Sequence, residues 1–532
     1  MNIFKRIISF FHKNEQAIYF ILLLCIAFTF SFSRYFLRMW IIVMVVLFIL
    51  NGRFPAKIRR LKQNYPLLIL ASFFFLFLLG SFYAVESNEG FKQLRVLLPW
   101  LGLPIVIGSY PGLSSYRFYL FLQVFILGVF LHTIISYLAS IGLPLGEVNT
   151  FRDLGLYYSI HRFVLTIVLA IFSLFYYLKI HIYHLNKLKL AGYFIALFWL
   201  VFFLFYTKNL TGILGFVLIS VIYIFYFALH QKNIFLRTAS LIIFLSITVF
   251  FGGKFYEVYA DFWKVPEISE MQLPEKTSNG NDYTHDTTST RIINGHYLNL
   301  FLCEKEIKVA WDKRSELGYN EKTDKSTKVR NVLKRYLTSK GLRKDSAGVS
   351  KLHETDIKAI EDGIINYKFA IFDFTDRLYM SARELHHYQE NSQPNGTLTA
   401  RLFAIKEGMK IFKQKPLIGH GTNSSNIIYN DFYSKFEERD RYYVTAHNQY
   451  VQFLIEFGII GFLWFLASIF YPYFVVKGYK FFMFNTMFAY FLIASFMNNP
   501  FSSQLALTIW VTFYSVFYVY FGYQNQGKEA IK

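Results

Sequence analysis

Apolar stretches of nearly membrane-spanning length dominate this chain of 532 residues. About 20 apolar residues are needed for a helix to cross the hydrocarbon core of a bilayer, and twelve stretches come close to that length. They lie near residues 16–33, 35–51, 66–84, 93–110, 117–140, 160–180, 190–206, 209–230, 234–252, 449–475, 478–497 and 503–522. The sequence therefore predicts an all-α polytopic membrane protein with about twelve transmembrane helices.

Composition and charge agree with this class. Hydrophobic residues make up 54% of the chain and charged residues 17%, whereas soluble chains carry about a quarter charged residues. The net charge of +21 gathers in the N-terminal segment, in residues 51–64 and 179–190, and in the C-terminal tail. All four fall on one side of a twelve-span arrangement, as expected for Lys and Arg retained in the cytoplasm. We therefore expect cytoplasmic termini and no nucleic-acid partner.

The segment between the ninth and tenth stretches has the composition of a folded soluble domain. The predicted division is a membrane bundle over residues 1–252, a domain over 253–447, and a second membrane part over 448–532. An odd number of spans precedes the domain, which places it outside the cytoplasm. No cleavable signal peptide is expected, because the first apolar run is long and lacks a small-residue cleavage site.

Periodic apolar residues predict a mainly helical outer domain. In residues 326–341 they recur at helical spacing from Val329, with Ser326 as the expected N-cap and Gly341 ending the helix. Residues 373–388 and 399–412 also read as helices, separated by the turn signal QPNGT. In the last of these, Leu398, Leu402, Ile405 and Met409 are expected to form one apolar stripe.

The chain offers no nucleotide, metal or disulfide chemistry. The stretch GHGTN (419–423) lacks the lysine and the context of a Walker A motif. Cys25 falls in a predicted span and Cys303 in the outer domain, so a cysteine framework is not expected. His386 and His387 are adjacent and cannot share a helical face as zinc ligands. We expect chemistry at the outer face, without cofactor or metal, on a substrate that is already activated.

His447 is the first candidate for that chemistry. It stands where the polar outer domain passes into the tenth apolar stretch, in the sequence TAHNQYVQF. A helix N-terminus disfavours a cation there and lowers the imidazole pKa, and a neutral imidazole is what a general base needs. The alternative is an interfacial histidine that binds water or a loop carbonyl.

Two arginines and a lysine could hold an anionic group. Arg401 borders the expected stripe, and its fork suits bidentate contact with phosphate or pyrophosphate. Arg162 lies just inside the outer end of the sixth stretch, where ionisable residues are costly and tend to be functional. Lys208 falls at an outer boundary between two spans and would suit an anionic lipid headgroup. Each of the arginines could instead be a snorkelling side chain.

Five blocks in order resemble the O-antigen ligase and polymerase (Wzy_C-like) superfamily, and more narrowly its Bacteroidetes-type branch. TAHNQYVQFLIEFGIIGF (445–462) is similar to the family's HNxxLxxxxEfGiiGl block, and TARLFAIKEGMKIFKQKPLIGHGTN (399–423) to the block before it. SIHRFVLTIVLAIF (159–172) looks like that branch's HIRF span, and NLTGILGF (209–216) like its TGLL span. LKRYLTSKGLRKDSAGVSKL (333–352) resembles part of its large loop.

The resemblance implies a membrane glycosyltransferase of lipopolysaccharide biosynthesis in the bacterial inner membrane. Such enzymes move a glycan from undecaprenyl pyrophosphate to an acceptor hydroxyl, without a metal and with inversion. Carried over, His447 would be the base, and Arg401 and Arg162 would hold the pyrophosphate. Asn448, in the HN pair, with Tyr450 and Lys208, would contribute to substrate binding. The implied partners are the lipid-linked donor, an acceptor glycan, lipid A–core or protein, and the bilayer.

The chain departs from the family pattern in three places. Many relatives have arginine where this chain has Leu210, which makes Lys208 the expected substitute in headgroup binding. His420 stands between two glycines where relatives have GVG. The stretch 498–510 only loosely resembles the family's last-span motif.

The alternatives within the family are a repeat-unit polymerase and a protein O-oligosaccharyltransferase, which differ from a ligase in the acceptor. The alternative from another class is a lipid-linked glycan flippase or transporter. Transporters usually show internal repeats and broken midplane helices. The chain shows no repeat, and a flippase poorly explains so large an insertion before the tenth span.

Overall fold

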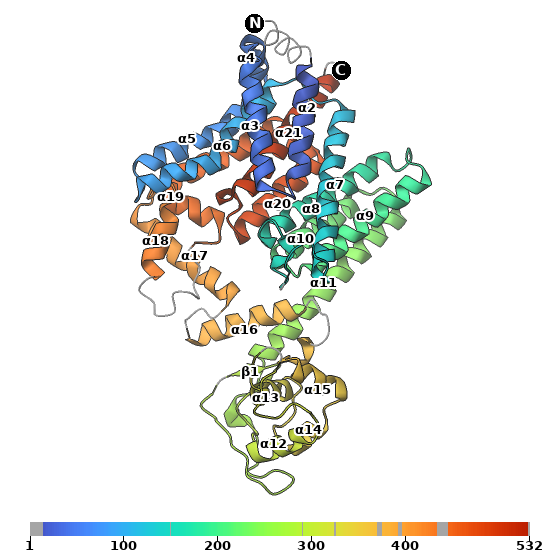
Figure 1. Ribbon diagram of the computed structural model, residues 1–532, viewed down its shortest axis with the longest axis vertical. Helices are drawn as coiled ribbons and strands as arrows, with labels where there is room; N and C mark the ends of the chain where they lie inside the picture. The colour runs from blue at the N-terminus through green and yellow to red at the C-terminus, as the bar shows by residue number, and fades with distance from the viewer. Residues whose placement is uncertain are drawn as a thin grey trace. The chain divides into compact units, whose positions relative to one another are not determined.

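The computed structural model describes residues 14–148, 150–289, 291–323, 326–369, 375–391, 396–433 and 445–529. Nearly all of the regular secondary structure in this part of the chain is helical, which confirms the predicted all-α membrane class. The chain forms two compact units (Figure 1). Unit 1 comprises Met1–Tyr223 with Arg401–Lys532, and unit 2 comprises Ile224–Ala400. The predicted division into residues 1–252, 253–447 and 448–532 was based on where the chain enters and leaves the membrane, which these two units do not test. It stays a prediction.

Unit 1 is a helical bundle assembled from both ends of the chain. Its helices are α2 (Glu15–Thr29), α3 (Arg34–Leu50), α4 (Phe54–Gln63), α5 (Pro66–Phe82), α6 (Ser87–Ser109), α7 (Ser115–Ser140), α8 (Ile160–His181), α9 (Lys187–Tyr206), α10 (Leu210–His230), α17 (Thr397–Gln414), α18 (Ser424–Tyr433), α19 (Gln449–Val475), α20 (Phe482–Met497) and α21 (Gln504–Glu529). Helices α10 and α17 cross the unit boundary. Short 3-10 turns are η1 (Asp153–Gly155), η5 (Gly478–Lys480) and η6 (Pro500–Ser502).

Each of the expected apolar stretches coincides with a helix. Among the described residues, eight helices are long and apolar enough to cross a membrane, or nine if α3 and α4, bent by 116°, count as one span. Helices α2, α5 and α20 are apolar but shorter, at 15, 17 and 16 residues. Helix α6 continues through Pro99 and Pro104, with α5 and α21 packed against it. The count of twelve spans stays a prediction.

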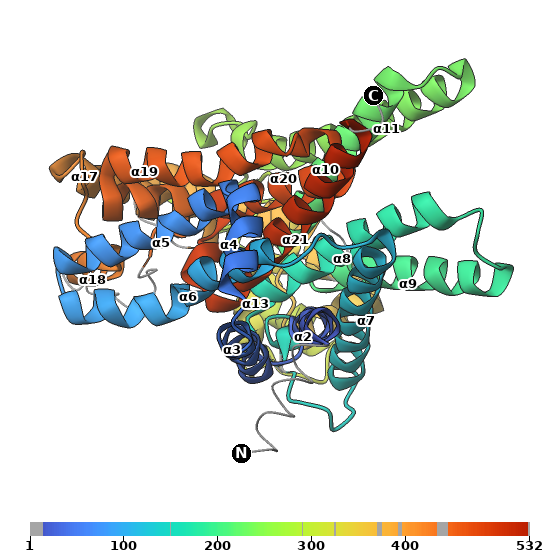
Figure 2. The ribbon, with the colours of Figure 1, turned by 90° about the horizontal axis from the view of Figure 1, so that it is seen from above.

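Helix α21 lies at the core of unit 1. From Leu505 to Phe521 almost every side chain is buried, on all faces of the helix. The ring of Tyr520 stacks on Phe118 of α7 with centroids 3.8 Å apart. A helix that is apolar on every side must be surrounded by other helices, here α6, α8 and α20. Figure 2 shows the neighbouring layer, in which α5 lies between α6 and α19.

Helix α19 is interrupted at Gly458, whose backbone has φ 62° and ψ −166°. The segment 416–421, after α17, lies against this break. Four backbone hydrogen bonds join the two: His420 N to Ile455 O (2.9 Å), Gly421 N to Glu456 O (2.8 Å), Ile459 N to Pro416 O (2.8 Å) and Ile460 N to Leu417 O (3.2 Å). Non-helical backbone at membrane depth is tolerated only where the protein itself supplies such partners. We call this contact the Gly458 junction.

The Gly458 junction also holds the end of α5. Thr422 donates from its hydroxyl to Phe77 O at 2.6 Å and from its backbone N–H to Gly80 O at 3.1 Å. Gly421 has φ +94°, and a Cβ there would lie 2.5 Å from the Cα of Ala84. Buried Glu456 accepts a hydrogen bond from Ser425 at 2.6 Å. One contact therefore fixes α5, α17, α18 and α19 relative to each other.

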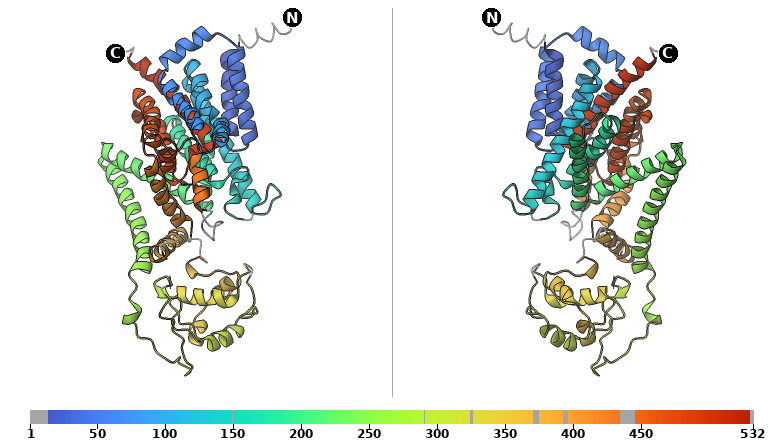
Figure 3. Two further views of the ribbon diagram at one scale, coloured as in Figure 1. Left: turned by 90° about the vertical axis from the view of Figure 1, so that its left-hand side faces the viewer. Right: turned by 90° about the vertical axis from the view of Figure 1, so that its right-hand side faces the viewer.

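Unit 2 combines a long helix with a loop-rich helical domain (Figure 3). Its elements are α11 (Ile234–Trp263), η2 (Ile268–Glu270), the antiparallel hairpin β1 (Ile292–Ile293) and β2 (His296–Tyr297), α12 (Glu304–Asp312), α13 (Val329–Ser339), α14 (Ser346–Ser350), α15 (Glu354–Glu361), η3 (Tyr367–Phe369) and α16 (Thr375–Asn391). The expected apolar positions of α13 are buried with Ile307 and Trp311 of α12 in one core. The mainly helical character of this segment is confirmed.

Some details of the predicted helices differ from the structure. The N-cap of α13 is Lys328 and not Ser326, because Lys328 pairs with Lys322 in an isolated β-bridge and Ser326 has left-handed backbone at φ +59°. Gly341, at φ +68°, does follow the end of α13. On α17, Ile405 and Met409 of the expected stripe pack against the buried cluster around Ala404, whereas Leu402 is 41% exposed. The expected start of α16 at 373 and most of the QPNGT turn lie outside the described residues.

The break in α19 predicts a sharp sensitivity at Gly458. A Cβ there would lie 2.3 Å from the backbone of Leu417, and the substituted residue would have to keep φ +62°. Gly458→Ala should therefore destabilise the protein by about 1–3 kcal/mol and lower its Tm in detergent. Gly192→Ala is the matched control, because no atom lies within 4 Å of its added Cβ. Equal melting temperatures for the two variants would contradict a structural role for the junction.

Candidate functional site

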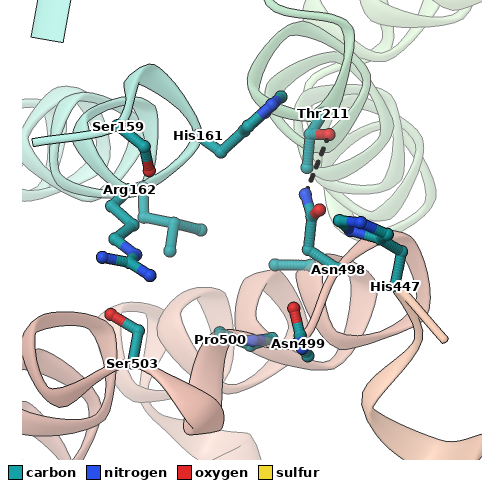
Figure 4. A pocket seen from close by; sticks show the side chains of 11 residues that line it. Ser159, His161, Arg162, Thr211, His447, Asn498, Asn499, Pro500 and Ser503 are labelled. Carbon is teal, nitrogen blue, oxygen red and sulfur yellow. Dashed lines mark hydrogen bonds between the residues drawn. The ribbon is translucent and has the colours of Figure 1, made fainter. Parts of the chain in front are cut away.

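A cavity of about 160 Å³ lies in unit 1, where four segments meet. Its lining residues are Ser159, His161, Arg162, Leu165, Thr211, His447, Ala494, Asn498, Asn499, Pro500 and Ser503. Figure 4 shows the side chains of α8 facing those of His447 and of the segment 498–503. The cavity is therefore built from residues more than 300 positions apart in the chain.

Helix N-termini converge on this cavity. Helix α8 begins after Ser159, α10 begins at Leu210 beside Thr211, and α19 begins two residues after His447. The first turn of a helix carries unpaired backbone N–H groups and a partial positive charge, which together favour a bound anion. Arg162, in the first turn of α8, adds a full positive charge. The site is thus suited to a phosphate-type group.

His447 occupies an uncommon backbone conformation at the mouth of α19. Its φ is +45°, and left-handed backbone at a residue other than glycine costs about 1–3 kcal/mol. The following residue, Asn448, caps the helix by accepting from the backbone N–H groups of Tyr450 (3.0 Å) and Val451 (3.1 Å). The cap holds the turn and directs the imidazole toward the cavity (Figure 4).

The surroundings of His447 keep its imidazole neutral at pH 7. Burial, followed by the positive charge of Arg401 and the neighbouring His161, lowers its pKa to about 4. A hydrogen bond with the side chain of Asn498 opposes this shift in part. Asn498 in turn donates to the hydroxyl of Thr211 at 3.4 Å. A neutral, oriented imidazole in a cavity is able to accept a proton from a bound hydroxyl group.

His161 is a second histidine in the cavity, and sequence reasoning missed it. The side-chain nitrogen of Asn209 lies 2.9 Å from His161 Nδ1. Because the amide nitrogen donates, Nδ1 accepts, and the neutral ring carries its proton on Nε2. The oxygen of Asn209 accepts from the backbone N–H of Gly212 at 3.2 Å, which fixes this orientation of the amide.

Arg401 acts on the site through its charge. It is not among the lining residues of the cavity, yet its charge contributes to the lowered pKa of His447. Helix α17 is held against the start of α19 by a cluster that includes Ala404, Tyr429 and Val451. Tyr429 donates to Ala404 O at 2.5 Å. The structure therefore brings all three predicted catalytic residues into one region.

The three predicted substrate-binding residues lie beside this cavity and do not line it. Asn448 is buried and caps α19, and it also donates to Phe496 O at 3.0 Å. The hydroxyl of Tyr450 donates to Leu492 O at 2.8 Å. Lys208, at φ +50°, places its ammonium 4.8 Å from the ring centre of Phe151. Their substrate contacts stay a prediction.

The lining also contains polar residues that the sequence could have signalled. His161 is adjacent to Arg162 in SIHRF, at the same helix entrance. Asn498 and Asn499 are polar residues between the apolar helices α20 and α21, and a proline follows them. No group of three or more His, Cys, Asp or Glu side chains suited to a metal occurs among the described residues.

Comparison with protein families gives one match. Residues 363–466 match the family model described as O-Antigen ligase. This range includes Arg401, the Gly458 junction and His447, and it excludes Arg162. No curated protein and no solved structure matches the chain significantly. The match does not resolve a branch within the family.

The electrostatics of the site predict the titration of His447. NMR of histidine-labelled protein, assigned by the signal missing in His447→Ala, should give a pKa of about 4. Arg401→Gln removes a positive charge and should raise this pKa toward the ordinary value of about 6.5. Arg59→Gln, an exposed charge on α4, should leave it unchanged. A pKa that does not respond to Arg401→Gln would show that the arginine does not act on His447.

Proposed function

The chain belongs to the O-antigen ligase-like superfamily of membrane glycosyltransferases, and from this premise we propose that it transfers a glycan from undecaprenyl pyrophosphate to an acceptor hydroxyl. The reaction takes place at the outer face of the bacterial inner membrane, with both chain termini in the cytoplasm. It inverts the anomeric carbon and needs no metal. The acceptor proposed first is lipid A–core, which makes the enzyme an O-antigen ligase.

The observation that carries this proposal is the composition of the cavity. It combines a neutral histidine with an arginine and three helix N-termini. Glycosyl transfer from a pyrophosphate needs these two functions, since a base must take the acceptor proton and positive groups must stabilise the leaving group. A polyprenyl pyrophosphate is already a good leaving group, so one base with electrostatic stabilisation is sufficient.

The proposed step is a single displacement. The acceptor oxygen forms a bond to the anomeric carbon while the bond from that carbon to the phosphate oxygen breaks. The acceptor proton passes to His447, and the electron pair of the broken bond leaves with undecaprenyl pyrophosphate. Arg162 and the N-termini of α8 and α10 stabilise the developing charge. Attack opposite the leaving group inverts the configuration.

The charges around His447 couple its basicity to donor binding. In the free protein, Arg401 and His161 contribute to the low pKa of His447. An anionic pyrophosphate offsets the positive charge of Arg401 and raises the pKa of the His447 imidazole in the complex. His447 therefore becomes the stronger base when the donor is in place. Arg401 is proposed to hold the pyrophosphate together with Arg162.

The proposed ligase differs from the two alternative enzymes of the same family in the acceptor that receives the glycan. A repeat-unit polymerase and a protein O-oligosaccharyltransferase would use the same donor and the same base. Deleting the gene and separating the envelope glycans on a gel distinguishes the three. Loss of glycan from lipid A–core supports the ligase, single-repeat products support a polymerase, and loss of glycoprotein signal supports a protein glycosyltransferase.

A lipid-linked glycan flippase is the alternative from another class. The interruption of α19 is a feature that transporters share, since they often bind substrate at broken helices. Here, however, the backbone groups around Gly458 are bonded to residues 416–421. The break supports the packing of α17 and leaves the cavity to other segments. A purified protein that forms a glycosidic bond decides for the transferase.

His447→Ala should abolish most of the transfer. Loss of a general base typically lowers the rate by about 10²–10⁴-fold. In the wild type, kcat/KM should fall as the pH drops through the pKa of about 4, because His447 becomes protonated and cannot accept a proton. The measurement is turnover of a polyprenyl-pyrophosphate glycan with purified acceptors in detergent. His184→Ala, an exposed histidine between α8 and α9, is the control.

A His447→Ala variant that transfers glycan as fast as His184→Ala would refute the assignment of the base.

Arg162→Gln should weaken donor binding. A hydrogen bond to a charged group contributes about 1.5–3 kcal/mol, so Kd for undecaprenyl pyrophosphate should rise about 10- to 100-fold. Titration of the lipid onto purified protein measures the effect. Arg59→Gln removes an exposed charge in the same unit and should bind like the wild type. If both variants bind equally, Arg162 does not contact the pyrophosphate.

A further inference from the structure

Buried polar side chains follow one face of α19 from its first residue. Gln449, Gln452 and Glu456 are spaced by three and four residues, so they lie on the same face of the helix, and each is at most 5% exposed. Polar groups are costly in an apolar bundle unless they are hydrogen-bonded. These three residues, which we call the α19 ladder, bond to the segment 498–503 that lines the cavity.

Hydrogen bonds along the α19 ladder fix the direction of the Gln452 amide. Glu456 Oε1 accepts from the hydroxyl of Ser425 at 2.6 Å and from Gln452 Nε2 at 3.0 Å. Because the amide nitrogen is the donor and faces Glu456, the amide oxygen of Gln452 faces the segment 498–503. The hydroxyl of Ser502 donates to this oxygen at 2.8 Å, which agrees with the assignment.

The same order extends to Asn499, which lines the cavity. Since Gln452 Oε1 is an acceptor, the group of Asn499 that meets it at 3.2 Å is the amide nitrogen, Nδ2. The amide oxygen of Asn499, Oδ1, therefore points away from Gln452, and Figure 4 shows it directed toward the middle of the cavity. Within the described part of the chain, no protein group donates a hydrogen bond to this oxygen. Asn499 thus presents a hydrogen-bond acceptor to whatever the cavity binds.

The backbone of the segment 498–503 is held by a separate residue of the ladder. Gln449 donates from its backbone N–H to Asn498 O at 3.1 Å and accepts with Oε1 from the backbone N–H of Phe501 at 2.9 Å. The side chain of Gln452 bonds only to the side chains of Asn499, Ser502 and Glu456. Gln452 therefore acts on the orientation of side chains, whereas Gln449 acts on the course of the backbone.

The place of Asn499 in the cavity indicates which part of a substrate it meets. Figure 4 shows the start of the segment 498–503 beside His447 and its end beside Arg162, with Asn499 between them. In the proposed transfer the acceptor hydroxyl lies at His447 and the pyrophosphate lies at Arg162. The anomeric carbon and its sugar ring then lie between the two, along the segment that carries Asn499.

We propose that Asn499 accepts a hydrogen bond from a hydroxyl or amide N–H group of the transferred sugar, and that Gln452 positions Asn499 for this contact. The inference rests on the proposed function, because that function places the sugar between Arg162 and His447. It adds a requirement on the substrate, since the sugar next to the pyrophosphate must carry a hydrogen-bond donor where it meets Asn499. Gln452 does not line the cavity and is a positioning residue.

The test is a titration of the purified full-length protein in detergent, without acceptor, so that binding is measured apart from turnover. The ligands are undecaprenyl-pyrophosphate N-acetylglucosamine, analogues that each lack one hydroxyl group, and an analogue with an ester oxygen in place of the amide N–H. One analogue should bind the wild type about 5- to 100-fold more weakly than the parent sugar, because it leaves the oxygen of Asn499 without a donor. A deoxy analogue identifies a hydroxyl as the donor, and the ester analogue identifies the amide.

Asn499→Ala should abolish this preference, so that the parent sugar and the discriminated analogue bind equally. Two ligands are compared on one variant, so a general loss of stability or lipid binding cancels, and the remaining coupling reports the contact. Gln452→Met keeps the length of the side chain but no longer bonds to the Asn499 amide, which can then turn. It should lose most of the preference although Asn499 is still present.

Two variants elsewhere in unit 1 are the controls. Asn485→Ala removes a side-chain amide of α20 that accepts a hydrogen bond from Tyr473 at 2.8 Å. Gln123→Met removes a side-chain amide of α7 that donates to Tyr193 at 2.8 Å. Neither residue lines the cavity, and both variants should keep the full preference of the wild type.

Full preference in Asn499→Ala would overturn the contact, and full preference in Gln452→Met would overturn the positioning role. Adding an acceptor to the same samples measures the proposed transfer separately. A wild type that transfers the sugar but binds every analogue as well as the parent overturns the contact alone. A wild type that binds with the expected preference and transfers nothing overturns the proposed function, while the contact of Asn499 with the bound sugar stands.

Discussion

The backbone hydrogen bonds at the Gly458 junction are the contact on which the rest of unit 1 depends. They allow α19 to break inside an apolar bundle without leaving polar groups unpaired. They also attach the end of α17 to α19, and through Thr422 they attach both to α5. Arg401 lies on α17, and His447, the proposed base, precedes α19. The relative position of these two residues therefore depends on the Gly458 junction. A change at Gly458 would act on the site without touching it.

The two stretches that most resemble the ligase family each contain a structural part and residues proposed for the chemistry. PLIGHG and EFGIIG supply the junction, where Gly421 and Gly458 have positive φ and no room for a side chain. The two residues proposed for the chemistry, Arg401 and His447, each lie upstream of one of these stretches. Of the eleven residues that line the cavity, only His447 lies within the matched residues 363–466, and the other ten belong to the segments around α8, α10 and residues 494–503. The matched range thus contains the proposed base, and nearly all of the remaining cavity lining comes from other parts of the chain.

Much of the helical architecture could be predicted, because the length of an apolar run reflects the thickness of the bilayer. Every expected stretch is a helix, including α6 with its two prolines. Local detail was less predictable. The expected cap Ser326 has φ +59° and lies outside α13, and Leu402 is exposed although Ile405 and Met409 of the same expected stripe pack against the core. His161 was not predicted, because its place in the cavity and its hydrogen bond with Asn209 depend on the packing of α8 against α10.

The sequence by itself determined the membrane class, the helices, the family and the identity of His447, Arg401 and Arg162 as candidates. These follow from hydropathy and from short motifs, which are properties of contiguous chain. Tertiary structure alone decided that Arg162 and His447 share one cavity with His161 and Asn498. Such meetings depend on how separate helices pack, and packing is set by shape and by backbone pairing between segments distant in the chain.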